Sequence, residues 1–149
     1  MGIRFSILIR SLETKGLRSK LEGFLIQPYI SGGIETILGV FKDVKAEHLI
    51  MFGLGGTHVE IFEDVKFKLL PINDVEAESL VKSIQSYELL KGVRGKPPVD
   101  IKYIEENLLR LSQLVKDFPE FIEIDFNPFV FSPKRKTCKI LDARMKVKI

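Results

Sequence analysis

The 149-residue sequence contains a single cysteine, Cys138, and only two histidines, His48 and His58. One thiol cannot close an internal disulfide, so a disulfide framework is excluded and a reducing, cytoplasmic setting is expected. Neither histidine has a second histidine or cysteine nearby in the sequence, which argues against a zinc site. Cys138 falls on an expected strand without a neighbouring base, and we expect it to serve in packing.

Long apolar runs and an excess of one charge are also lacking. The apolar stretch within residues 1–16 is short and is interrupted by Arg4 and Arg10, unlike a signal peptide or a membrane span. The 23 basic and 20 acidic residues leave a net charge of +3, too small and too mixed to indicate nucleic-acid binding. We therefore expect no membrane and no nucleic acid among the partners.

The sequence also lacks the standard phosphate-binding motifs. The segment 50–72 holds three glycines, Gly53, Gly55 and Gly56, but no Walker A sequence occurs in the chain, and His58 takes the place of the third glycine of a dinucleotide-binding fingerprint. Glycines permit positive φ angles and close backbone approach, which serve both tight turns and phosphate cradles. Two interpretations stay open here: a hairpin turn, or a loop that approaches a phosphate.

What is present is the pattern of one α+β domain. Apolar residues make up 45% of the chain and charged residues 29%. Strand-like runs are expected at 4–10, 24–30, 34–41, 48–52, 58–62, 66–70 and 121–131, with a final strand after 136. Two helices are expected between them, one capped by Asn73 with Glu76, and one capped by Asp100 and stopped by Pro119. Strands, then helices, then strands favour an antiparallel sheet with helices on one face.

The last hairpin carries the strongest chemical pattern. Glu123, Asp125 and Asn127 alternate with apolar residues, so their oxygen-bearing side chains share one face of a strand. If the hairpin turns about residues 134–135, Asn127 lies opposite Asp142, with Cβ atoms roughly 5 Å apart. Carboxylate and amide oxygens of this kind hold Mg²⁺. The alternative, a solvated strand face, also fits the alternation.

Five segments taken together resemble a known family. They are residues 23–43, 51–72, 89–100, 111–129 and 141–144, and they resemble the ATP-grasp domain of ADP-forming acyl-CoA synthetases, which include the archaeal acetyl-CoA synthetase β subunit and are related to the succinyl-CoA synthetase β subunit. The resemblance covers residues 23–145. It implies the C-terminal subdomain of the ATP-grasp fold, ATP or ADP and Mg²⁺ as cofactors, and the reaction of an acid, ATP and CoA to acyl-CoA, ADP and phosphate.

The resemblance also implies roles for individual residues. Asn127 and Asp142 match the Mg²⁺ ligands, and Asp125 matches an acidic residue that supports them. The remaining residues that match nucleotide-binding positions are Gln27, Pro28, Tyr29 and Ile30 of the adenine linker, Glu35, the turn glycines Gly53, Gly55 and Gly56, and Arg94 of the Gly-Val-Arg-Gly loop. Pro28 departs from the family pattern, because an acidic residue is common there and proline lacks an N–H donor. His58 stands at a usually apolar position and is not expected to be catalytic.

The same resemblance suggests how the chain is divided. Residues 1–22 are expected to be an N-terminal strand and connection belonging to the preceding lobe, and residues 23–149 the C-terminal lobe. The family's other lobe, its phosphohistidine domain and its CoA-binding domains would come from elsewhere, such as a companion subunit, so the chain is not expected to be active alone. The alternatives are a non-catalytic paralogue that binds nucleotide weakly or assembles with partners or itself, and a lobe of a related protein acetyltransferase.

Overall fold

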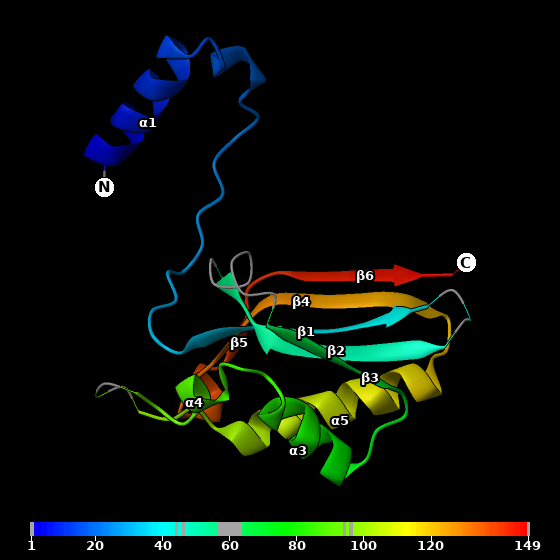
Figure 1. The fold of residues 1–149 in the computed structure, drawn as a ribbon. Coiled ribbons are helices and arrows are strands. Elements are labelled where there is room, and N and C mark those ends of the chain that lie inside the picture. Colours follow the sequence, from blue (N-terminus) through cyan, green and yellow to red (C-terminus); the bar gives the residue numbers. More distant parts are fainter. Residues whose placement is uncertain are drawn as a thin grey trace. The chain divides into compact units, whose positions relative to one another are not determined.

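A computed structural model describes residues 2–43, 45, 47–56, 64–93, 95 and 97–148. They form two compact units, Met1–Ser31 and Gly32–Ile149. The first unit contains helix α1, Gly2–Thr14, and a short 3₁₀ helix, Arg18–Lys20 (Figure 1). The second unit contains all the described strands and the remaining helices.

The first unit differs from the sequence prediction. The strand expected at 4–10 lies inside helix α1, and residues 24–30 have no regular secondary structure. Alternation of Phe5, Ile7 and Ile9 suggested a strand, but a strand needs a neighbour for its hydrogen bonds, and the described part of this unit holds no other strand. A helix closes its hydrogen bonds within the segment itself. Both strand predictions were therefore wrong for a shared reason, the lack of a pairing partner.

The second unit is built on an antiparallel sheet. Its strands are β1 (Ile34–Lys42), β2 (His48–Leu54), β3 (Val65–Leu69), β4 (Phe121–Phe131), β5 (Lys139–Ile140) and β6 (Ala143–Val147). The strand order is β3-β2-β1-β4-β5. Strand β6 also pairs with β4, along a different segment of β4 from the one that pairs with β5. All of these pairings are antiparallel, which confirms the predicted fold class. The strand expected at 58–62 lies outside the described residues.

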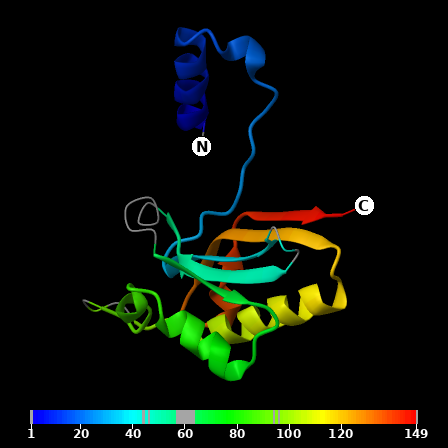
Figure 2. The same ribbon diagram turned by 45° about the vertical axis from the view of Figure 1, so that its right-hand side comes forward.

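Helices cover one face of this sheet, as the two views show (Figures 1 and 2). They are α3 (Asp74–Lys82), α4 (Tyr87–Leu90) and α5 (Ile101–Asp117), of which the four-residue α4 was not predicted. The Asn73 side chain and Glu76 form the expected capping box, and Asp100 accepts the N–H of Tyr103 at 3.0 Å. None of the described helices is long and apolar enough to cross a membrane.

The hydrophobic core lies between the sheet and these helices. Its strand residues include Leu38, Val40, Ile50, Phe52 and Ile124, and its helix residues include Ala77, Leu80, Val81, Ile104, Leu108, Leu111 and Val115. These helix positions recur at the three- and four-residue spacing of one helix face, which is why they are buried together. Because α3 and α5 pack on one side, the described residues of the second unit supply no helical layer to the opposite face of the sheet, which we call the open face.

Candidate functional site

The register of the last hairpin is the one expected from the sequence. Phe126 pairs with Ala143, and the main-chain N–H of Asn127 donates to the carbonyl oxygen of Asp142 at 3.1 Å. On the other side, the N–H of Leu141 donates to the carbonyl oxygen of Pro128 at 2.9 Å. Asn127 and Asp142 therefore lie directly opposite each other on neighbouring strand segments.

Polar side chains of this hairpin gather on the face that lacks a helical layer. Ile124 is fully buried in the core, so its neighbours Glu123 and Asp125 point to the other side of β4. Arg144 lies opposite Asp125 in the register, and its Nη2 atom is 3.4 Å from Oδ2 of Asp142. The hairpin thus presents carboxylates, an amide and a guanidinium on one surface.

Asp125 occupies the most desolvated position of this group. Its Oδ1 atom is buried, and within the described part of the chain it has no hydrogen-bond partner. Burial raises the pKa of its carboxyl, the charge of Arg144 lowers it, and the carboxylates of Glu123 and Asp142 raise it further, with a net upward shift. A buried oxygen without a partner is costly, so an approaching cation or hydrogen-bond donor would be stabilised here.

The donor set suits a hard cation better than zinc. Among the described residues, no three histidine, cysteine, aspartate or glutamate side chains are placed to hold a metal ion by themselves, so a metal here would need a further donor such as a phosphate. Asp125, Asn127 and Asp142 instead offer carboxylate and amide oxygens, and Mg²⁺ is usually held by one or two carboxylates together with substrate phosphates. The residues present therefore fit Mg²⁺ bound jointly with a phosphate ligand.

The same face carries an apolar area that the sequence analysis missed. It consists of Phe41, Leu49, Met51, Phe67 and Leu69, which we call the apolar platform. Across the strands, Phe41, Leu49 and Leu69 are aligned, as are Met51 and Phe67. Phe67 and Leu69 are 52% and 51% exposed. The platform continues to the polar hairpin, because Gly39 pairs with both Met51 and Asp125.

Strand β3 explains why the platform was missed. Its sequence alternates Lys66, Phe67, Lys68 and Leu69, which shows that the two apolar residues share a face but not which face it is. In the structure Lys66 lies opposite the buried Phe52, so the lysines are on the helix side and the apolar residues point away from the core. Only the register with β2 shows that the lysines of β3, and not its apolar residues, face the helices.

The glycine turn, Gly53–Gly56, takes in the end of β2 and the two residues after it, and it packs against the start of β1. The N–H of Gly55 donates to the carbonyl oxygen of Glu35 at 2.7 Å. Gly56 has a φ of +75°, and a Cβ atom there would lie 2.6 Å from Oε2 of Glu35. A Cβ atom at Gly53 would lie 2.5 Å from the carbonyl oxygen of Asp64. The structure thus brings Glu35 together with Gly55 and Gly56, while the hairpin predicted between 48–52 and 58–62 extends outside the described residues and stays a prediction.

The remaining predicted site residues lie either in the first unit or outside the described residues. Gln27, Pro28, Tyr29 and Ile30 belong to the first unit, in a segment without regular secondary structure, where residues 27–29 are exposed. Their role in holding adenine stays a prediction. Arg94 and His58 lie outside the described residues, and so does the phosphate contact predicted for Arg94.

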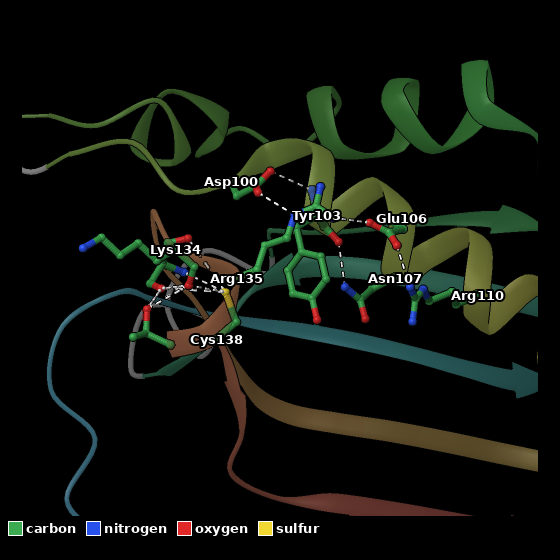
Figure 3. A network of polar contacts seen from close by, with 10 residues as sticks. Asp100, Tyr103, Glu106, Asn107, Arg110, Lys134, Arg135 and Cys138 are labelled. Carbon is green, nitrogen blue, oxygen red and sulfur yellow. Dashed lines mark hydrogen bonds and ion pairs between the residues drawn. The ribbon is translucent and has the colours of Figure 1, made fainter.

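A polar network on the helix side braces the turn of the last hairpin (Figure 3). Arg135 donates through Nε to Asp100 at 2.9 Å and through Nη1 to Glu106 at 2.7 Å, and it lies 4.9 Å from the centre of the Tyr103 ring. The hydrogen bond from Arg135 lowers the pKa of the Asp100 carboxyl. Cys138, in the same turn, packs partly buried against the core, as expected. This network fixes the turn to α5 and contributes no group to the open face.

The chain matches the ATP-grasp domain family over residues 4–147. It is 40% identical over 141 residues to the 4-hydroxybutyrate–CoA ligase (ADP-forming) of Nitrosopumilus maritimus, and the match covers 95% of this chain and 20% of the ligase. It is 40% identical over 131 residues to the acetate–CoA ligase (ADP-forming) II subunit beta of Pyrococcus furiosus, covering 87% of this chain and 56% of that subunit.

A solved structure shows the same similarity. It is the dinucleotide-forming acetyl-coenzyme A synthetase 1 of Ca. Korarchaeum cryptofilum in complex with coenzyme A and Mg-AMPPCP, with a TM-score of 0.76 and 37% identity. The match covers 93% of this chain and 64% of that chain, so this chain spans only part of the relatives it matches. These similarities confirm the resemblance inferred from the sequence motifs.

Proposed function

Since this chain belongs to the ATP-grasp family, we propose that the open face of its sheet binds the phosphates of ATP or ADP together with Mg²⁺. The observation that carries the proposal is the pairing of Asn127 with Asp142, fixed by a 3.1 Å main-chain hydrogen bond. Asp125, with its buried and unpartnered Oδ1, lies on the same strand two residues before Asn127. Three hard oxygen donors beside one another match the needs of Mg²⁺.

Within this proposal, Asn127 and Asp142 hold the metal ion, and Asp125 supports them from the neighbouring position on β4. When bound, Mg²⁺ would neutralise charge on the nucleotide phosphates during phosphoryl transfer. Arg144, which lies opposite Asp125 and near Asp142, supplies a positive charge beside the carboxylates. It limits their mutual repulsion while the site holds no cation.

The other nucleotide contacts are assigned by family membership. We propose that Glu35 and the glycines Gly53, Gly55 and Gly56 line the phosphate end, with Arg94 as a further phosphate contact. Gln27, Pro28, Tyr29 and Ile30 are proposed as the adenine linker. The close packing of Gly55 and Gly56 on Glu35 supports the first assignment, because it presents glycine backbone and a carboxylate together. Residues 23–149 would then form the C-terminal lobe, and residues 1–22 would belong to the preceding one.

We further propose that the chain serves an ADP-forming acyl-CoA synthetase, which converts an acid, ATP and CoA into acyl-CoA, ADP and phosphate. Support comes from the two relatives named as ADP-forming CoA ligases, each 40% identical to this chain. The chain spans 20% of one and 56% of the other. CoA and the acyl substrate would therefore bind other domains, or a companion subunit, in a cytoplasmic enzyme.

Calorimetric titration of the chain with Mg-ADP tests the proposed site. Wild-type protein is expected to bind weakly, and Asp142→Ala or Asn127→Ala should reduce the affinity at least about tenfold, the loss of one charge-assisted contact. Asp117→Ala, which removes a carboxylate at the end of α5, is the matched control and should bind like wild type. Tight binding that survives Asp142→Ala would refute the assignment.

A second candidate function, a non-catalytic assembly module, is favoured by one observation. Phe67 and Leu69 of the apolar platform are each about half exposed, and exposed apolar patches often mark association surfaces. Sedimentation of the chain over a range of concentrations, with and without Mg-ADP, separates the two functions. Self-association that Mg-ADP leaves unchanged, with no heat of nucleotide binding, would favour assembly over nucleotide binding.

A further inference from the structure

Asp64 is a buried carboxylate that the proposed site does not use. The residue is only 5% exposed and lies directly before β3, at the end of the connection from the glycine turn. Its Oδ1 atom accepts the main-chain N–H of Gln85 at 2.7 Å, and its Oδ2 atom accepts the N–H of Ser86 at 2.8 Å. The Ser86 hydroxyl donates a third, short hydrogen bond to Oδ2. Buried carboxylates seldom occur without a specific reason.

The three donors belong to the corner between α3 and α4, residues 83–86, which is part of the helical layer. The backbone of Asp64 adjoins the sheet directly before β3, and its carbonyl oxygen packs against Gly53 so closely that a Cβ atom there would lie 2.5 Å away. Gly53, which lies in β2 at the start of the glycine turn, pairs with Val65. Asp64 therefore touches the start of the glycine turn through its main chain and the helical layer through its side chain.

The charge state of Asp64 is set by these contacts. Burial alone would raise the pKa of its carboxyl, but the hydrogen bonds from Ser86 and Gln85 and the positive charge of Lys66 outweigh burial and lower the pKa overall. The carboxylate is therefore ionised at neutral pH. Each of its contacts to the corner is a charge-assisted hydrogen bond, the stronger kind.

We propose that Asp64 is a positioning residue for the glycine turn, whose ionised side chain ties Gly53–Gly56 to the α3–α4 corner and so holds the turn in its binding geometry. The part of this inference that concerns nucleotide affinity rests on the proposed function. Without the tie, the turn would keep the Gly55 hydrogen bond to Glu35 and the core packing of Leu54, but it would lose the polar link to the α3–α4 corner. Local opening of the turn would then cost less free energy.

The first test needs no ligand. Amide hydrogen exchange of the full chain is compared for wild type, Asp64→Asn, Ser86→Ala and Asp117→Asn. Asp117 is the control, because it is a carboxylate at the end of α5 that accepts a side-chain hydrogen bond from Gln113 and takes no part in the glycine turn or the last hairpin. Asp64→Asn should speed exchange at Gly55 about tenfold relative to the β1–β4 ladder, and the milder Ser86→Ala less. Equal exchange at Gly55 in Asp64→Asn and Asp117→Asn would overturn the proposal.

The second test measures Mg-ADP affinity in the same variants. Asp64→Asn and Ser86→Ala should weaken binding, while Ser86→Thr, which keeps the hydroxyl, should restore it and Asp117→Asn should leave it unchanged. If wild type binds and Asp64→Asn binds equally well, the positioning role fails while the nucleotide function stands. If wild type shows no binding, the nucleotide function fails, and exchange at Gly55 alone decides whether Asp64 positions the turn.

Discussion

The main-chain N–H of Asn127 donates to the main-chain carbonyl oxygen of Asp142 at 3.1 Å, and both side chains are exposed. The hydrogen bond belongs to the backbone, so it persists whatever side chains stand at the two positions. The geometry that juxtaposes the proposed metal ligands is therefore supplied by strand pairing, and their side chains remain available for a ligand. Binding and stability should consequently be separable at this site.

Replacing either ligand should change binding but hardly affect folding. Asn127→Ala and Asp142→Ala should alter the free energy of unfolding by less than about 0.5 kcal/mol, since exposed side chains contribute little. Urea denaturation measures this quantity. The contrasting variant is Ile124→Ala, which truncates a fully buried core side chain on the same strand. It should lower the free energy of unfolding by about 2–5 kcal/mol. A loss of more than about 2 kcal/mol in Asp142→Ala would show that its role is structural.

The glycine turn should tolerate side chains poorly. Gly56→Ala should cost about 1–2 kcal/mol, because alanine disfavours the φ of +75° found there. Gly53→Ala should cost about 1–3 kcal/mol, because its Cβ atom would meet the main chain of Asp64, which cannot rotate away. Gly23→Ala is the control, since a Cβ atom there would meet nothing within 4 Å. Thermal unfolding of the three variants measures these losses of stability. A Gly53→Ala variant as stable as wild type would contradict the close packing of Gly53 against Asp64.

Acid should weaken the fold partly through Asp64. Its pKa is below the ordinary value of 3.8 in the folded chain, so the unfolded chain binds this proton more readily. The stabilisation is complete above about pH 4 and is lost as the pH falls through the folded-state pKa. At neutral pH, Asp64→Asn should cost about 1–3 kcal/mol, and its difference from wild type should shrink as the pH falls below the ordinary carboxyl pKa and through the lowered folded-state pKa. A difference that stays constant with pH would contradict an ionised Asp64.

Much of the second unit could be predicted because local patterns and tertiary packing agree there. Asn73 and Asp100 cap helices as their positions suggested, and the apolar faces of α3 and α5 are buried. The position of the turn determines the register of the last hairpin, so the pairing of Asn127 with Asp142 could be predicted from the sequence. Local turn geometry determines register in a hairpin, which explains this success.

The features that escaped prediction depend on partners distant in sequence. The segment 4–10 lies in a helix, and the described residues of its unit offer no strand with which it could pair. The outward apolar face of β3 depends on how Lys66 aligns with Phe52, which alternation alone cannot tell. The burial of Asp64 depends on a corner more than twenty residues later in the chain, and no local pattern marks it.

The apolar platform should behave as an accessible binding surface. Phe67→Ser should cost only about 1 kcal/mol, because the side chain is half exposed and its main partner is the edge contact with Phe41, whose ring centre lies 5.8 Å away. The double variant Phe67→Ser/Leu69→Ser should nevertheless lower the fluorescence of the apolar dye ANS by about half, because ANS binds contiguous exposed apolar surface. Dye titration at equal protein concentration measures this change.

The control variant is Val75→Ser, which removes an even more exposed apolar side chain, 74% exposed, from α3 on the other side of the sheet. It should leave dye binding unchanged, since a single exposed side chain offers no platform. Mg-ADP added to wild type should displace part of the dye if nucleotide and platform share the open face, because Gly39 links Met51 to Asp125 across the strands. Dye fluorescence that is equal in wild type and the double variant would show that the platform is not an accessible ligand surface, and the assembly function would lose its support.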